Sequence, residues 1–144
     1  MHINSMKGIT KDAPVLPLGN PGVLLVPLFE GFGNKPEPVV SPGQEVKKYQ
    51  VIAKSEKGFQ VHAPVSGVVE KIEKNSQLDG SEVVTIFICN DHMETEIPYL
   101  RPEVVLQDPQ AILQAIREAG IVGLGGAQFP TAVKYDRKGK KVNT

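Results

Sequence analysis

The sequence has one cysteine, no excess of charge of either sign and no long apolar run. Cys89 alone cannot form a disulfide within the chain or supply a cysteine-ligated cluster. The 16 basic and 16 acidic side chains cancel, so no overall field favours nucleic acid, and we expect none as a partner. The apolar residues 23–29 fall far short of the ~20 residues of a membrane-spanning helix, so we expect no direct membrane span. The first residues, MHINSM, lack the apolar stretch of a secretory signal, which favours a cytoplasmic protein.

Glycine and proline are abundant, and they separate short segments rich in Val and Ile. The 14 glycines and 12 prolines make up about 18% of the chain, against a usual ~12%. Turn sequences such as SPGQ, EKG, PVSG and LDG recur at intervals of roughly 8–12 residues, which predicts an all-β sandwich or barrel. The expected strands are 23–28, 37–41, 50–54, 59–63, 66–72 and 82–88. The expected core residues are Val26, Val40, Val51, Ile52, Val61, Val68, Val69, Ile72, Val84, Ile86 and Ile88, and we expect Cys89 to be a buried structural thiol.

The composition divides the chain into four parts. Residues 1–22 form an irregular lead-in, 23–97 the β domain, 98–107 a proline-bounded linker, and 108–144 a helix followed by a glycine-rich loop and a basic tail. We expect that tail to be solvated, although a surface facing phosphate is the other interpretation.

One helix is expected after the linker. Asp108 is a good N-cap, Pro109 suits the first helical position, and Gly120 is typical of a helix end. The apolar positions Ile112, Leu113, Ile116 and Ala119 form one stripe. Because the helix is short, it must pack against something to persist in water.

The histidines at positions 62 and 92 lack the spacing of a metal site. His62 precedes APVSG inside a strand pattern, and no second His or Cys lies near it, so we expect a packed structural side chain. His92 lies among Asp91, Glu94 and Glu96, where we expect a solvated loop rather than a weak divalent site. We therefore predict no metal ligands in this chain.

Two segments of the β region resemble the two halves of biotinyl- and lipoyl-type domains. These are VVSPGQEVKKYQVIAK (39–54) and VHAPVSGVVEKI (61–72). The resemblance implies a barrel-sandwich hybrid, in which two small sheets pack face to face. In a carrier domain a lysine occupies the hairpin tip, here 55–58, but Glu56 takes that position and Lys57 lies beside it. A carrier role is thus the weakest of the alternatives.

The stretch GIVGLGGAQFP (120–130) contains four glycines in seven residues. Such glycines let backbone N–H groups approach an anion without obstruction by a Cβ atom, and a helix opening at Thr131 would add its positive end. The pattern is neither G-x-x-x-x-G-K-[ST] nor G-x-G-x-x-G, because Gln128 holds the sixth place. The pattern alone leaves a cofactor loop and a plain connector equally open.

The longer stretch REAGIVGLGGAQFPTAVK (117–134) resembles the flavin-binding loop of the NADH-binding subunit of respiratory complex I. It is most similar to the RnfC subunit of the Rnf electron-transport complex, including relatives associated with proline reductase, in which the loop also follows a barrel-sandwich domain. The resemblance runs from about Lys7 to Thr144, with Gln128 in place of a family glycine. It implies that the loop binds FMN or nucleotide phosphates through Gly123, Gly125, Gly126 and Ala127, with Phe129 shaping the pocket and Lys134 offering a charge.

The same resemblance implies an NADH-linked electron-transfer subunit that passes electrons through flavin to iron–sulfur clusters. In the family the chain continues into the rest of an α/β nucleotide-binding domain and then into cysteine-rich segments that hold [4Fe-4S] clusters. We therefore expect this sequence to be an amino-terminal fragment with a truncated nucleotide-binding domain, inactive alone. It would be peripheral on the membrane face through other subunits of the complex. The alternative from another class is a stand-alone barrel-sandwich module that binds a partner protein.

Overall fold

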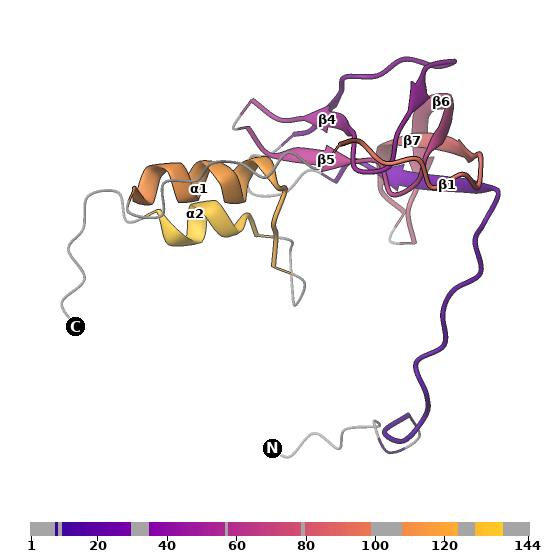
Figure 1. Ribbon diagram of the computed structural model, residues 1–144, viewed down its shortest axis with the longest axis horizontal. Coiled ribbons are helices and arrows are strands. Elements are labelled where there is room, and N and C mark those ends of the chain that lie inside the picture. Colours follow the sequence, from indigo (N-terminus) through magenta and orange to yellow (C-terminus); the bar gives the residue numbers. More distant parts are fainter. Residues whose placement is uncertain are drawn as a thin grey trace.

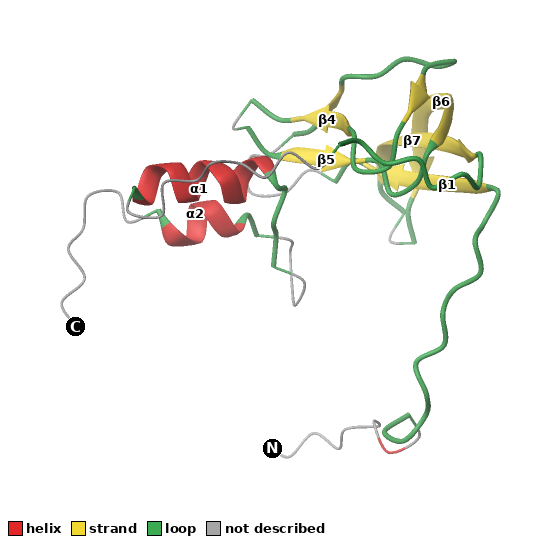
Figure 2. Cartoon of the chain, in the orientation of Figure 1, coloured by secondary structure: helices red, strands yellow, loops and turns green. Residues whose placement is uncertain are grey.

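The computed structural model describes residue 8 and residues 10–29, 35–56, 58–78, 80–98, 108–123 and 129–136. Within these residues the chain forms two antiparallel sheets and two short helices (Figures 1 and 2). The four-stranded sheet contains, in spatial order, β1 (Val23–Pro27), β7 (Glu82–Asn90), β6 (Gly67–Ser76) and β3 (Glu45–Val46). The three-stranded sheet contains β2 (Glu37–Pro38), β4 (Val51–Lys54) and β5 (Gln60–His62). The predicted mainly β architecture is confirmed.

The core lies between the two sheets. Both sheets are short and rich in Val and Ile, so each buries one apolar face against the other. The buried apolar residues that form this cluster are Leu28, Val40, Val46, Ile52, Ala53, Ala63, Val65, Val69, Ile86 and Ile88. Of the predicted core residues, Val26, Val61, Ile72 and Val84 pack against the cluster while half-buried, and Val51 is also half-buried. Leu28, Val46, Ala53, Ala63 and Val65 were not predicted.

Two predictions about burial are wrong, and they share one cause. Val68 is 39% exposed, and Cys89 is exposed rather than buried. In the register of the sheet, Cys89 pairs with Val23 on one side and with Val68 on the other, so the three form one row. Their neighbours Ile88 and Val69 face the core. Because successive side chains alternate between faces, that row points to the outside.

Glycine is required where β6 begins. Gly67 is buried with φ +152°, and a Cβ atom there would lie 1.9 Å from the carbonyl oxygen of Cys89. Gly43, in the SPGQ turn, also has a positive φ, of +83°. The two positions differ in surroundings, because a Cβ at Gly43 would meet nothing within 4 Å.

Residues 10–22 precede β1 without a strand or a helix and leave the sheets as an extended segment (Figure 1). Asn90, at the end of β7, anchors the base of this segment. Its side-chain amide donates to Asn20 Oδ1 (2.7 Å) and to the Pro21 carbonyl (3.0 Å), and its backbone N–H donates to the Gly22 carbonyl (2.8 Å).

The two helices, α1 (Pro109–Glu118) and α2 (Thr131–Tyr135), lie together near β5 (Figure 1). The predicted helix is confirmed as α1. The proposed domain limits stay a prediction, and residues 99–107 and 137–144 of the linker and basic tail lie outside the described residues. No helix among the described residues has the length and apolar character needed to cross a membrane.

Candidate functional site

Both ends of α1 have the capping interactions that the sequence predicts. At the start, Asp108 Oδ1 accepts the N–H of Gln110 at 2.9 Å, and Pro109 occupies the first turn. At the end, Gly120 has φ +64° and donates its N–H to the Arg117 carbonyl (3.1 Å). The Ile121 N–H donates to the Ile116 carbonyl (3.3 Å). This pair of bonds is a Schellman motif, which turns the chain sharply out of the helix.

The two segments that flank the glycine-rich loop are paired with each other. Val122 and Pro130 form an antiparallel bridge. The Gly123 N–H donates to the Phe129 carbonyl (3.1 Å), and the Thr131 N–H donates to the Ile121 carbonyl (3.0 Å). These bonds join the segment that follows α1 to the segment that precedes α2, on either side of residues 124–128. Pro130 is buried, so this closure is part of the packed structure.

Three of the predicted site residues can be placed. Gly123 is exposed and Phe129 is half-buried beside it, while Lys134 is exposed on α2. The Lys134 ammonium lies 5.8 Å from the ring centroid of its neighbour Tyr135. The other three predicted residues, Gly125, Gly126 and Ala127, lie outside the described residues, as does Gln128.

An apolar groove runs between α1 and α2. It has a volume of about 390 Å³ and is lined by Pro109, Ile112, Leu113, Ile116 and Tyr135. Four of these residues belong to α1, and they include three of the four positions of the predicted stripe. Leu113 is buried and Ile112 and Ile116 are half-buried, whereas Ala119 is exposed.

The last turn of α1 lies against β5 and the hairpin that precedes it. A Cβ atom added at Gly120 would lie 2.2 Å from the Gln60 carbonyl oxygen and 3.7 Å from His62 Nδ1. A Cβ atom at Gly58 would lie 3.1 Å from Arg117 Cδ. Burial lowers the pKa of His62, which favours its neutral form near pH 7. His62 is thus a half-buried side chain at this contact, in agreement with its predicted structural role.

The hairpin tip at 55–58 is a tight turn. Ser55 is buried, and its hydroxyl accepts the Phe59 N–H at 3.2 Å. The Gly58 N–H donates to the Ser55 carbonyl (2.9 Å). Glu56 is exposed, and Lys57 lies outside the described residues.

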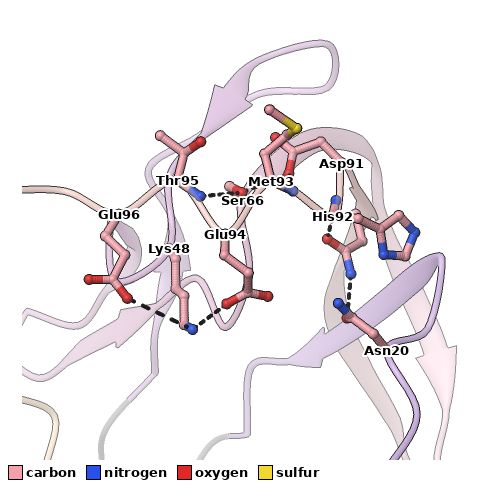
Figure 3. A network of polar contacts seen from close by, with 10 residues as sticks. Asn20, Lys48, Ser66, Asp91, His92, Met93, Glu94, Thr95 and Glu96 are labelled. Atoms are coloured by element: carbon pink, nitrogen blue, oxygen red, sulfur yellow. Dashed lines mark hydrogen bonds and ion pairs between the residues drawn. The ribbon is translucent and has the colours of Figure 1, made fainter.

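A polar network fastens the loop that follows β7 (Figure 3). The Ser66 hydroxyl donates to Asp91 Oδ1 (2.7 Å) and accepts the Thr95 N–H (2.9 Å). Asp91 Oδ1 also accepts the Met93 N–H (2.8 Å). The hydrogen bond from Met93, followed by that from Ser66, holds the pKa of Asp91 below its usual value.

Lys48 joins the same loop to the segment between β3 and β4. Its ammonium pairs with Glu94 and lies 3.9 Å from Glu96 (Figure 3). The hydrogen bond to Glu94 raises the pKa of Lys48. His92 is exposed in this loop, as expected, with φ +57°. Across the described part of the chain, no group of three or more His, Cys, Asp or Glu side chains could hold a metal ion.

Comparison with known proteins places this fold in a class. Residues 1–93 match the family model of the RnfC barrel sandwich hybrid domain, so the two packed sheets are those of a barrel-sandwich hybrid. The chain belongs to the RnfC family, which confirms the resemblance noted from the sequence.

Several curated relatives extend this match beyond the barrel. The chain is 36% identical over 127 residues to the C subunit of the Na(+)-translocating ferredoxin:NAD(+) oxidoreductase complex of Acetobacterium woodii, covering 83% of this chain and 28% of the relative. It is 33% identical over 147 aligned residues to the C subunit of the ion-translocating oxidoreductase complex of Rhodobacter capsulatus, covering 97% of this chain and 28% of the relative. The corresponding protein of Pseudomonas aeruginosa is 39% identical over 127 residues, which cover 83% of this chain and 16% of the relative. The chain therefore spans little more than a quarter of the length of these relatives, or less.

Sequence reasoning missed the contact between α1 and β5. It identified Gly120 as a helix end, and Gly58 as part of a hairpin tip, from local patterns. Nothing local indicates that these two turns meet, because they are far apart in the sequence. The Asn90 anchor and the Ser66 network were missed for the same reason.

Proposed function

We propose that this chain is the amino-terminal part of an NADH-linked electron-transfer subunit of the RnfC type. In this proposal the barrel-sandwich domain supports a glycine-rich loop that holds the phosphate of FMN or of a nucleotide. The observation that carries it is the order of parts. A family barrel domain is followed by a capped helix, a closed glycine-rich loop and a second helix. Relatives that match 83% and 97% of this chain are named as oxidoreductase subunits.

The described residues on either side of the loop include an exposed glycine and an exposed lysine. Gly123 is exposed, and among the described residues a Cβ atom there would come within 4 Å of the Phe129 carbonyl oxygen alone, at 3.8 Å. Lys134 is exposed on α2 and offers an ammonium group. Backbone amides of closely spaced glycines form concave anion sites. We propose that a phosphate group approaching the loop from solvent meets open backbone, with Lys134 as the source of positive charge.

The residues divide into three roles. Gly123, Gly125, Gly126 and Ala127 would present backbone to the phosphate, Phe129 would form a wall of the pocket, and Lys134 would supply charge. Because the Gly123 N–H already donates to Phe129, the amides of the other three residues are the proposed donors to the ligand. A bound flavin would supply hydride acceptance from NADH and onward transfer of single electrons. We propose that the [4Fe-4S] clusters belong to the remaining part of the longer protein.

The partners follow from the same proposal. The relatives are named as subunits of a complex, so we propose that this chain contacts other subunits of an electron-transfer complex and is peripheral to the membrane through them. Its barrel would then be a support for the cofactor loop, with no catalysis by this chain alone.

Substitution within the loop tests the cofactor site. We expect Gly125→Val with Gly126→Val to weaken FMN binding by about tenfold or more, because two branched side chains would block the approach to the backbone. The matched control is Gly19→Val, in the extended lead-in, where a Cβ atom meets nothing within 4 Å. Titration of FMN, followed by quenching of its fluorescence, measures the affinity. Equal affinities for the loop variant and the control would refute the site.

A stand-alone binding module is the second candidate, and the apolar groove between α1 and α2 favours it. A groove lined by Ile112, Leu113 and Ile116 could take an apolar segment of a partner protein. In that case Ile112→Ser would abolish capture of the partner while FMN titration gave no saturable change. A carrier role is the weakest candidate, and an unchanged intact mass after incubation with biotin or lipoate ligase removes it.

A further inference from the structure

The end of α1 touches β5 so closely that only glycine fits at position 120. A Cβ atom there would lie 2.2 Å from the Gln60 carbonyl oxygen and 3.4 Å from the carbonyl carbon. Side chains do not approach backbone oxygen at such distances, so the two backbones are in direct contact. Since β5 is an outer strand of the three-stranded sheet, the helix end covers part of an edge that would otherwise be free.

A second contact lies on the hairpin before β5. The aliphatic part of Arg117 packs over Gly58, where a Cβ atom would lie 3.1 Å from Cδ and 3.7 Å from Cγ. The guanidinium of Arg117 is held within the helix, because it donates to Gln114 Oε1 at 2.9 Å. Two residues from one helical turn therefore contact the same hairpin. We call this pair of contacts, Gly120 with Gln60 and Arg117 with Gly58, the α1–β5 contact.

The α1–β5 contact is adjacent to the glycine-rich loop. Gly120 is followed directly by Ile121, whose carbonyl accepts the Thr131 N–H (3.0 Å). Gly123, two residues further, donates to Phe129. The paired segments on both sides of residues 124–128 thus continue from the residue that lies on β5.

We propose that Gly120 is a positioning residue, which fixes the two flanks of the glycine-rich loop at one orientation relative to the barrel-sandwich domain. The barrel is then the rigid base of the loop rather than a body tethered through a linker. The contact itself stands on the packing alone, whereas its effect on FMN rests on the proposed function. Gly120 would touch no ligand and would act through Ile121 to Gly123.

A simple capping role predicts a different response to substitution. Asn is the next best residue after Gly where a helix ends with positive φ. If Gly120 served only the Schellman motif, Gly120→Asn would be tolerated. If the contact with Gln60 matters, the Cβ atom of Asn clashes with the Gln60 carbonyl oxygen. Gly120→Asn then disturbs the α1–β5 contact as much as Gly120→Ala does.

The test measures the distance between the barrel-sandwich domain and α1 directly. Spin labels are placed on the exposed positions Lys74 of β6 and Gln110 of α1, in a Cys89→Ser background, and their distance distribution is recorded by pulsed electron resonance. We expect one narrow distribution for the unsubstituted chain, and broadened, multiple populations for Gly120→Ala and Gly120→Asn. Gly58→Ala, which presses only on the flexible Arg117 side chain, should give a smaller broadening.

The controls are Gly43→Ala and Gly80→Ala. These glycines have φ +83° and +82°, and no described residue lies within 4 Å of an added Cβ, so alanine there imposes backbone strain without a steric clash. They should leave the distance distribution unchanged. Amide signals of the barrel core report that each variant is folded. A narrow, unshifted distribution in Gly120→Asn would overturn the proposal.

FMN titration of the same variants separates this inference from the proposed function. If both are right, Gly120→Asn weakens FMN binding by about tenfold, because the loop amides lose their common orientation. If the unsubstituted chain binds no FMN but Gly120→Asn still broadens the distance distribution, the positioning role stands and the cofactor proposal fails. A Gly43→Ala variant that weakened FMN binding equally would overturn the positioning role.

Discussion

Val68 and Val69 are adjacent on β6, yet one points to solvent and the other to the core. Val69 is fully buried and pairs with Ile88, whereas Val68 is 39% exposed and pairs with Cys89. Removing buried methyl groups leaves a cavity and loses the free energy of transferring them out of water. Removing the same groups at the surface has neither effect. This pair therefore reports the register of the sheet at single-residue resolution.

We expect Val69→Ala to lower the free energy of unfolding by about 2–4 kcal/mol. Val68→Ala, on the same strand, should lower it by less than about 1 kcal/mol. Urea unfolding followed by circular dichroism measures both variants. A larger loss for Val68→Ala would mean that the strand presents the other face to the core.

Gly67 is a position where the backbone of one strand leaves no room for a side chain. With a virtual Cβ 1.9 Å from the Cys89 carbonyl oxygen and φ +152°, Gly67→Ala must displace β6 from β7. We expect a loss of about 3 kcal/mol or more in the free energy of unfolding. Gly80→Ala, in the open turn between the same strands, is the control. It should lower the free energy of unfolding by about 1 kcal/mol. Similar losses in the two variants would rule out the close approach.

At the scale of elements, α1 depends on its caps because it has only 10 residues. Asp108→Ala removes the oxygen that accepts the Gln110 N–H. We expect this substitution to lower the stability of α1 by about 1 kcal/mol. Asp108→Asn keeps an acceptor in place and should behave like the original chain. Hydrogen exchange of the α1 amides compares the two variants. Equal protection in both would show that the cap contributes nothing.

The loop after β7 depends on Ser66, which is buried and joins Asp91 to Thr95. We expect Ser66→Ala to cost about 1–3 kcal/mol, because the Thr95 N–H loses its partner. It should also raise the pKa of Asp91 toward its ordinary value of 3.8. Ser41→Ala, at an exposed turn, is the control.

The sign of the pH dependence follows from the direction of that pKa shift. The folded-state pKa of Asp91 lies below the unfolded value, so its contribution to stability is present above pH ~4 and is lost as pH falls through the folded pKa. In Ser66→Ala this acid-dependent loss should be smaller. Carbon NMR titration of the Asp91 carboxyl checks the shift, and an identical pKa in both proteins would contradict the assigned cause.

Sequence patterns predicted the elements better than the contacts between them. Turn chemistry located the strands, and the residues Asp108, Pro109 and Gly120 located α1 and both its ends. The face of β7 was missed at Cys89, because VVTIFIC is apolar apart from Thr85 and shows no alternation that would indicate which face is buried. Strand β3 was missed because its two residues give no periodic signal.

For the candidate site too, the sequence indicated the residues but not the contacts that support them. The motif indicates which residues flank the loop, and the structure shows Gly123 and Phe129 joined by a hydrogen bond. The support of the loop by β5 was not predictable, because it arises from a contact between turns that are distant in the sequence. Composition and periodicity carry no information on such a contact.

At the scale of the whole molecule, two packed sheets hold an extended lead-in at one point and a helical pair at another. Asn90 fixes the base of the lead-in, and β5 carries the end of α1. The loop that is proposed to bind a cofactor connects these two helices in the sequence. The central claim is therefore that the barrel-sandwich domain presents a phosphate-binding loop.

Amide chemical shifts of the isotope-labelled chain, titrated with FMN and separately with riboflavin, test this claim most directly. Both compounds carry the flavin ring, but only FMN carries the phosphate that the loop is proposed to hold. We predict saturable shifts for FMN at the amides of residues 123–127 and at Phe129, with little change in the barrel core and much weaker shifts for riboflavin. Shifts of equal size for the two compounds, or an unmoved loop with shifts elsewhere, would contradict the claim.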